Sequence, residues 1–212
     1  MHHVSSRAVF RAGVFGVAAT VTLGFPVGPA GAFEEAPQLA DRVEAGDLPP
    51  VDERLPEEPL TVEPIETIGT YGGVWRSALL GGSDSAWLAR TVGYEGLVRY
   101  DRDWTSVVPD VAKDWEINED ATRFTFHLRP GMKWSDGEPF TAEDVAYAFE
   151  LSQNTAYPGE VPAFIRDPQN PPHASAEDDE TVVFTFDKPN GLFMQQLSMV
   201  DGPNAILFPK MP

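Results

Sequence analysis

The chain has no cysteine among its 212 residues, and histidine is also scarce. The lack of cysteine excludes disulfides, thiolate metal sites and thiol nucleophiles. Of the four histidines, two stand at positions 2 and 3, and the other two are His127 and His173. Neither of these has a second histidine or a cysteine at ligand spacing. The sequence therefore predicts no metal site, and we expect no cofactor.

Positive charge is the second shortage. Fifteen Lys and Arg stand against 33 Asp and Glu, which gives a formal net charge of −18. Such a chain would be repelled by the phosphates of a nucleic acid and equally by an anionic membrane surface. We therefore expect no nucleic-acid partner.

The chain also lacks a long hydrophobic run. Its main apolar stretch, from Ala12 to about Phe25, is rich in Gly and Ala and is shorter than the roughly 20 residues of a spanning helix. It follows Arg7 and Arg11 and leads to Ala30-Gly31-Ala32, a small-residue cleavage pattern. We predict that residues 1–32 are a Sec-type signal peptide cleaved after Ala32, so that the mature chain resides in the periplasm. An uncleaved membrane anchor is the alternative.

Residues 33–68 form a zone of their own composition, an acidic proline-rich lead. It holds eleven Asp or Glu, two Arg and six Pro. A segment of this kind buries too little apolar surface to offset the entropy of ordering its backbone. We expect an extended or polyproline-like lead with one helical turn near "APQLADRVEAG"; the alternative is a disordered tail.

Residues 69–212 show the periodicity of a folded body. Val74–Leu80 is predicted as a strand, and "GGSDSAWLART" as a loop entering a helical turn with Ser83 or Asp84 as N-cap. A short strand is expected at 96–100. A long proline-rich connection is expected at 158–180.

The clearest element is a hairpin around "NEDAT". In "RFTFHLR", Phe124, Phe126 and Leu128 alternate with polar residues, as in a strand with one buried face. "TVVFTFD" repeats the pattern at 181–187, so the two strands are candidates for one sheet. Between them we predict a helix at about 142–153, with Thr141 as N-cap and Asp144 completing a variant capping box.

No pattern typical of catalysis occurs. The G-x-S-x-G elbow and the phosphate-binding glycine loops are missing, and no pair of carboxylates is marked out among the 33. We therefore predict a binding protein without catalytic residues. Each of the ten Trp and Tyr residues is more often a core residue than a ligand contact. Trp115 and Trp134 look most like core, whereas Trp87 lies in a polar loop after a strand and is the better ligand candidate.

Three segments together resemble a known family: "YEGLVRYD", "VVPDVAKDWEINEDATRFTFHLRPGMKWSDGEPFTAEDVAYAFE" and "DDETVVFTFDKPNGLF". In order and content they are similar to the N-terminal half of the family 5 extracellular solute-binding proteins, the peptide-binding components of bacterial ABC importers. The resemblance covers about residues 71–208. It implies an α/β fold: an incomplete lobe of the type II periplasmic-binding-protein kind, with a small extra α+β subdomain. The second lobe of the family would be missing, so we expect residues 69–212 to be a fragment.

The same resemblance implies a function and a site. Relatives capture a small-molecule solute, a peptide or an oligosaccharide among others, and deliver it to an ABC permease in the inner membrane. The chain is expected to be a monomer. Residues of "GGSDSAWLART" and "GYEGL" face the cleft in the family, so the expected ligand-binding residues are Ser83, Asp84, Ser85, Trp87 and Tyr94. An exported polysaccharide-active hydrolase and a stand-alone interaction domain are the rival classes.

Overall fold

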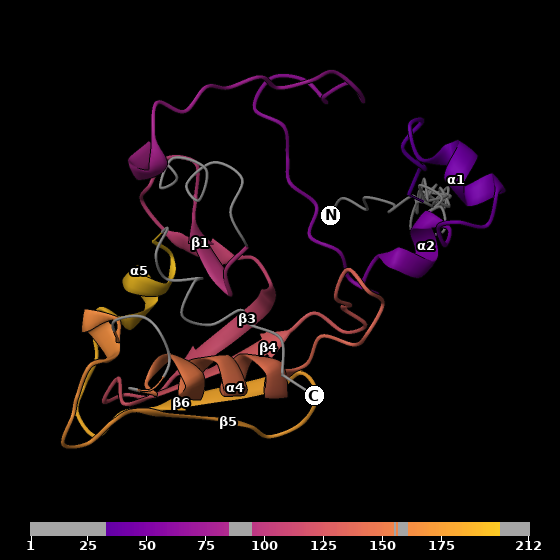
Figure 1. Cartoon of the computed structure of the whole chain (residues 1–212). Helices are drawn as coiled ribbons and strands as arrows, with labels where there is room; N and C mark the ends of the chain where they lie inside the picture. Colours follow the sequence, from indigo (N-terminus) through magenta and orange to yellow (C-terminus); the bar gives the residue numbers. More distant parts are fainter. Residues whose placement is uncertain (1–32, 85–94, 155, 157–160, 200–212) are drawn as a thin grey trace, which may run out of the picture. The chain divides into compact units, whose positions relative to one another are not determined.

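A computed structural model of the chain describes residues 33–84, 95–154, 156 and 161–199. The centre of this part is a four-stranded antiparallel sheet in the order β3–β4–β6–β5 (Figure 1). Its strands are β3 (Ala112–Ile117), β4 (Arg123–Leu128), β5 (His173–Ala176) and β6 (Thr181–Thr185). Two further strands, β1 (Val98–Tyr100) and β2 (Val107–Pro109), pair with each other in a separate antiparallel ribbon.

The predicted hairpin and the predicted shared sheet are both confirmed. Phe124, Phe126 and Leu128 of β4 are buried, as the alternation requires. β4 pairs directly with β6, which places Phe124 opposite Phe184 and Phe126 opposite Val182. One face of the sheet is therefore a continuous apolar surface.

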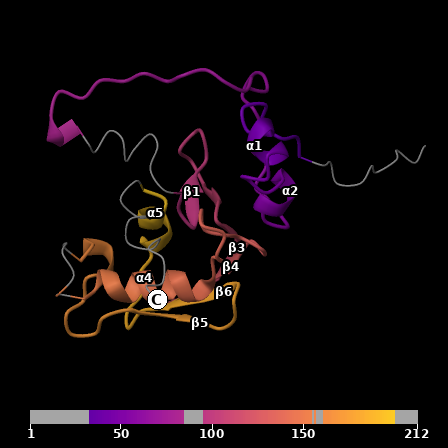
Figure 2. The same cartoon turned by 45° about the vertical axis from the view of Figure 1, so that its right-hand side comes forward.

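Helix α4 (Ala142–Ser152) covers that surface, as the sequence predicts. Its Val145 and Phe149 are fully buried, and the Phe149 ring meets the Phe184 ring edge-on with 4.9 Å between centroids. Both views of the chain show α4 alongside β5 and β6 (Figures 1 and 2). The short helix α5 (Phe193–Leu197) adds Phe193, whose ring contacts that of Phe124.

The start of α4 carries the predicted capping box. The Asp144 carboxylate accepts the backbone N–H of Thr141 at 2.9 Å, so one of the unpaired donors at the helix end is satisfied. Trp134 differs from expectation, because it is half-buried at the rim rather than in the core. Its ring packs edge-on against Phe140, and its indole N–H donates to Asp144 at 3.3 Å. A buried indole needs an acceptor for its N–H, and the carboxylate at the rim supplies one.

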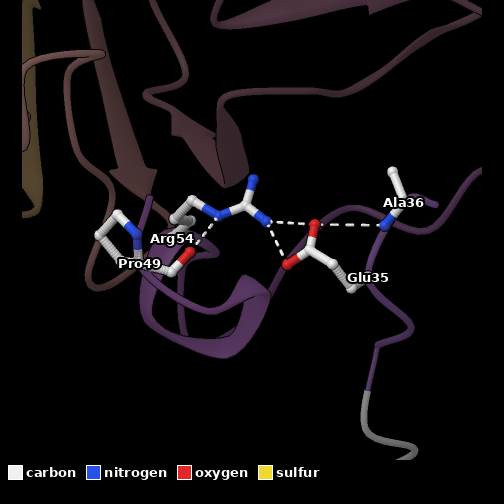
Figure 3. A network of polar contacts seen from close by, with 4 residues as sticks. All are labelled: Glu35, Ala36, Pro49 and Arg54. Carbon is white, nitrogen blue, oxygen red and sulfur yellow. Dashed lines mark hydrogen bonds and ion pairs between the residues drawn. The ribbon is translucent and has the colours of Figure 1, made fainter. Parts of the chain in front are cut away.

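The acidic lead is more ordered than its composition predicts. The expected helical turn is α1 (Ala40–Glu44), and a second one, α2 (Val51–Arg54), was not expected. Arg54 ties the segment together, since its Nη2 lies 2.6 Å from both Glu35 oxygens and its Nε donates to the Pro49 carbonyl at 2.9 Å (Figure 3). The hydrogen bond from Arg54 is the main reason why the pKa of Glu35 lies below its ordinary value.

The end of the lead contacts the loop that follows β4. Three hydrogen bonds join them: from the Glu57 N–H to the Pro130 carbonyl (3.0 Å), from Arg129 Nη1 to the Glu58 carbonyl (3.0 Å) and from Lys133 Nζ to the Glu53 carbonyl (2.8 Å). Gly131 permits the approach: its φ is +73°, and a Cβ there would lie 3.3 Å from Cγ of Glu57.

Two other expectations differ from the structure. Val74–Leu80 is not a strand; Trp75 is 69% exposed and Leu80 fully exposed. A strand is stable only when a neighbouring strand completes its hydrogen bonds, and neither described sheet includes this segment. The connection at 158–180, in turn, is not all loop. It contains a 3₁₀ turn, η2 (Ala163–Ile165), and the edge strand β5.

Candidate functional site

The predicted ligand loop begins in a described turn and continues beyond it. Ser83 and Asp84 lie together in η1 (Gly82–Asp84), a single 3₁₀ turn. The Asp84 carboxylate accepts the Leu80 backbone N–H at 2.7 Å, so it closes this turn. The helical turn that Ser83 or Asp84 was expected to cap lies outside the described residues. Ser85, Trp87 and Tyr94 lie outside the described residues, and their role stays a prediction.

The far end of the loop is fixed to the β1–β2 ribbon. The Val111 N–H donates to the Gly96 carbonyl at 3.1 Å, and the Ala112 N–H to the Leu97 carbonyl at 3.0 Å. These bonds extend the ribbon from β2 to the first residue of β3. The chain therefore leaves the predicted loop directly into hydrogen-bonded backbone, which gives the loop a firm anchor.

A buried carboxyl group lies at this anchor. Asp110 is only 7% exposed, and its Oδ2 has no hydrogen-bond partner among the described residues. Burial, and then the neighbouring Glu95 carboxyl, raise the pKa of Asp110 to about 7, against the opposing charges of Arg99 and Arg129. Near neutral pH, Asp110 thus takes up a proton that an exposed aspartate would have released.

Sequence reasoning missed this pair. Glu95 lies in "GYEGL", next to the predicted Tyr94, while Asp110 lies in "VVPDVA", where a carboxylate is flanked by apolar residues on both sides. An acidic residue inside an apolar strand-like run was the available signal. Its partner is 15 positions earlier, and only the register of β1 against residues 107–112 brings the two together.

A row of three polar side chains crosses the sheet on the face that α4 does not cover. Asp114, His127 and Thr181 are cross-strand neighbours on β3, β4 and β6. His127 Nε2 lies 3.8 Å from Asp114, and its Nδ1 lies 3.5 Å from the Thr181 hydroxyl. These separations exceed the roughly 2.6–3.2 Å of an activated nucleophile and its base. The Thr181 hydroxyl instead donates to Asp178 at 3.1 Å, so the row has the geometry of a hydrated surface network.

Two shallow hollows occur in the described part of the chain. One, of about 300 Å³, is lined by Lys113, His127 and residues 178–181. The other, of about 180 Å³, lies beside the Lys188–Asp167 ion pair. Neither includes Ser83 or Asp84. Within the described ranges, no three His, Asp or Glu side chains are grouped as metal ligands, and no helix has the length and apolar character needed to cross a membrane.

Comparisons with known proteins match the part of the chain that contains the four-stranded sheet and α4. Residues 106–206 match the profile of the bacterial extracellular solute-binding proteins, family 5 middle region. This range begins just before β2 and contains the four-stranded sheet, α4 and α5. Just under half of the chain thus matches the sequence profile of this family. The resemblance drawn from the sequence motifs is thereby confirmed.

Similar proteins include a periplasmic alpha-galactoside-binding protein of Rhizobium meliloti, 37% identical over 51% of the chain and 18% of the relative. A dipeptide-binding protein of Escherichia coli is 32% identical over 50% of the chain and 22% of the relative. The solved structure of an oligopeptide-binding protein, OppA, superposes on 82% of the chain with a TM-score of 0.71 and 37% identity, and the match spans 27% of that structure. The chain thus spans about a fifth to a quarter of the length of the relatives it matches.

These matches confirm the predicted fold class, part of a lobe of the type II periplasmic-binding-protein kind. The described sheet is antiparallel with one covering helix, which is the character expected of the small α+β subdomain. Family 5 consists of solute-binding proteins rather than enzymes.

Proposed function

We propose that this chain is the solute-binding component of an ABC importer. It captures a peptide or an oligosaccharide in the periplasm, after cleavage of residues 1–32 behind Ala32, and delivers it as a monomer to a permease in the inner membrane. No residue of the chain acts as a catalyst, and no cofactor takes part. The superposition on an oligopeptide-binding protein over 82% of the chain is the observation that carries this proposal.

We place the solute at the loop that begins with Ser83 and Asp84 and runs through Ser85, Trp87 and Tyr94. Its two anchors support this choice: η1, closed by Asp84, on one side and the hydrogen-bonded Gly96–Leu97 backbone on the other. Loops held by rigid elements are the usual position of binding residues. Ser83, Asp84 and Ser85 supply hydrogen-bonding groups, and Trp87 and Tyr94 supply flat apolar surfaces.

The test is a titration of the uniformly ¹⁵N-labelled chain with Ala-Ala, a hexapeptide and raffinose at millimolar concentrations. Solute-binding proteins of this kind close two lobes around the ligand, and a single face of the cleft makes only part of the contacts. We therefore expect weak binding, with chemical-shift changes from the two peptides confined to residues 83–95. Trp87→Ala should abolish these changes, while the exposed Trp75→Ala should preserve them.

Two results would contradict the proposal. Shift changes that centre on another part of the chain would displace the site, and the absence of changes with all three solutes would remove it. Micromolar binding in calorimetry would disprove the expectation that this chain supplies only part of the contacts.

A further inference from the structure

The tip of the β1–β2 ribbon displays a tryptophan in an unusual backbone conformation. Trp104 has φ of +57°, in the left-handed region that favours glycine, and its side chain is 65% exposed. Among the described residues, Ala121 is the other non-glycine residue with positive φ. Ala121 packs against the core, and its carbonyl accepts the Asn190 N–H at 2.8 Å. Trp104, by contrast, is not part of the core.

The turn that holds Trp104 is well determined. The Asp101 carboxylate accepts the backbone N–H and the hydroxyl of Thr105, each at 2.8 Å, and the Trp104 N–H donates to the Asp101 carbonyl at 3.1 Å. The hydrogen bonds from Thr105 keep the pKa of Asp101 below its ordinary value, so the carboxylate stays charged and available as an acceptor. Glycine would fit this backbone without strain, and a strained position occupied by a large side chain points to a use for that side chain.

Trp104 presents one flat face to solvent. Its ring is stacked on that of Tyr100, with 5.3 Å between centroids and 27° between planes. One face of the ring is therefore turned to Tyr100, and among the described residues no other ring is stacked on Trp104. Because the two rings lie one above the other and not around a space, they form a plate, which does not enclose a cation as an aromatic cage does.

The size of the plate indicates the kind of ligand. An aromatic side chain offers about 150–250 Å², whereas a stable protein interface takes about 800 Å² from each partner. Between residues 95 and 116, Trp104 is the one large apolar side chain that is exposed. The plate is too small for a protein partner and matches a single ring with one apolar face.

Polar groups complete the rim of the plate. Arg102 and Asp103 directly precede Trp104 in the chain; both are exposed and form an ion pair at 3.6 Å, so their charges offset each other and both side chains are accessible to a ligand. An apolar plate beside a donor and an acceptor of balanced charge suits a neutral polyhydroxylated ring. In a β-pyranose the axial C–H groups make one face apolar, while the equatorial hydroxyls point outward to the rim.

We propose that Trp104, stacked on Tyr100, is a saccharide-binding platform that stacks on the apolar face of a pyranose ring. Arg102 and Asp103 hydrogen-bond to the ring hydroxyls. The platform consists of other residues than the solute loop at 83–94, and the proposal does not depend on the transport role proposed for that loop. Both a free saccharide and the exposed end of a polymeric glycan present this ring, and the experiment separates them.

The test is saturation-transfer-difference NMR on the full chain with methyl β-D-glucopyranoside and raffinose, together with a pull-down on an insoluble β-glucan. We expect saturation of the H1, H3 and H5 protons of the glucoside. Trp104→Ala and Trp104→Gly should each lower the signal at least fivefold, whereas Trp104→Phe should retain part of it. Trp75→Ala is the matched control, because Trp75 is similarly exposed, and it should leave the signal unchanged.

Trp104→Gly keeps the proposal testable, because glycine adopts the left-handed backbone without strain and the turn is preserved. Binding to the glucan alone, lost in Trp104→Gly, would assign the platform to polymer ends; binding to the glucoside would assign it to free saccharides. A signal that is equal in wild type and Trp104→Gly would overturn the proposal, as would a lack of saccharide binding in both arms. A loss caused by Trp87→Ala instead of Trp104→Gly would place saccharide binding at the solute loop.

Discussion

The carboxylate of Asp144 accepts hydrogen bonds from two different segments: from Thr141, through its backbone N–H at 2.9 Å and its hydroxyl at 3.4 Å, and from the indole N–H of Trp134 at 3.3 Å. A single side chain therefore fixes the first turn of α4 and the preceding β-turn around Gly137. The Asp144 side chain is itself buried. These donors supply hydrogen bonds that a buried polar group needs.

Replacement of Asp144 by alanine should destabilise the chain. The cap is lost and the Trp134 N–H is left without this acceptor, so we expect the free energy of unfolding to fall by about 1–3 kcal/mol. Urea denaturation followed by tryptophan fluorescence measures the change. Glu138→Gln, an exposed substitution nearby, is the control and should change stability by less than about 0.5 kcal/mol. Equal effects of the two substitutions would refute a capping role for Asp144.

The buried Asp110 makes stability depend on pH in a predictable direction. Its pKa is raised to about 7 from an ordinary value of 3.8, so the folded chain binds this proton more tightly than the unfolded chain does. The stabilisation from this group is complete below about pH 4 and is lost as the pH rises through 7. Its full size is at most about 4 kcal/mol, because each pKa unit corresponds to about 1.4 kcal/mol.

Asp110→Asn should remove this dependence. The free energies of unfolding of wild type and variant are compared from pH 4 to 8. Other carboxylates also titrate in the acidic range, and taking the difference between the two proteins removes the contributions that they share. We expect the wild type to lose stability relative to Asp110→Asn as the pH rises. Asp120→Asn, at an exposed position, should run parallel to the wild type. A parallel Asp110→Asn curve would mean that Asp110 titrates as an ordinary aspartate.

Gly131 and Gly137 form a matched pair for testing the contact between the lead and the body. Both have positive φ, +73° and +94°, so alanine strains the backbone at each. A Cβ at Gly131 also meets Glu57, while one at Gly137 meets nothing within 4 Å. We expect Gly131→Ala alone to release the lead, seen as faster cleavage at residues 45–65 in limited proteolysis. Equal cleavage rates in both variants would show that the contact does not hold the lead.

Arg54→Lys tests the fork of hydrogen bonds inside the lead. Lysine keeps the positive charge, but it cannot contact Glu35 and the Pro49 carbonyl at the same time with the planar geometry of a guanidinium. Hydrogen exchange of the α1 and α2 amides should therefore accelerate in Arg54→Lys, while exchange in β4 stays as in the wild type. Unchanged exchange in both helices would assign their order to other contacts.

Local patterns in the sequence are sufficient to predict the central elements. The alternation of Phe124, Phe126 and Leu128 predicts β4, and the spacing of Thr141 and Asp144 predicts the first residue of α4. Both signals act over a few residues, within one strand or one helical turn, and the sequence alone contains them. The motifs that resemble family 5 lie in these same strand and helix segments, so the family could also be predicted from the sequence.

Expectations that depend on distant residues could not be settled in this way. Val74–Leu80 has the composition of a strand, but pairing needs a neighbour that composition does not supply. Arg54 and Glu35 order the acidic lead across 19 positions, and Asp110 meets Glu95 across 15, in both cases through folding of the intervening chain. Of the predicted site residues, Ser83 and Asp84 are placed in one turn; Ser85, Trp87 and Tyr94 remain predictions.

The strand order of the sheet indicates the order in which its strand pairs can form. A five-residue turn joins β3 to β4, so this hairpin can form as soon as its residues are available. β6, the other neighbour of β4, pairs His127 with Thr181, 54 positions later. Pairing at such a distance is slow, because a long loop must close first. Until β6 arrives, Phe124 and Phe126 have only their β3 partners, Ile117 and Trp115, and the β6 edge of β4 is open to pairing with another chain.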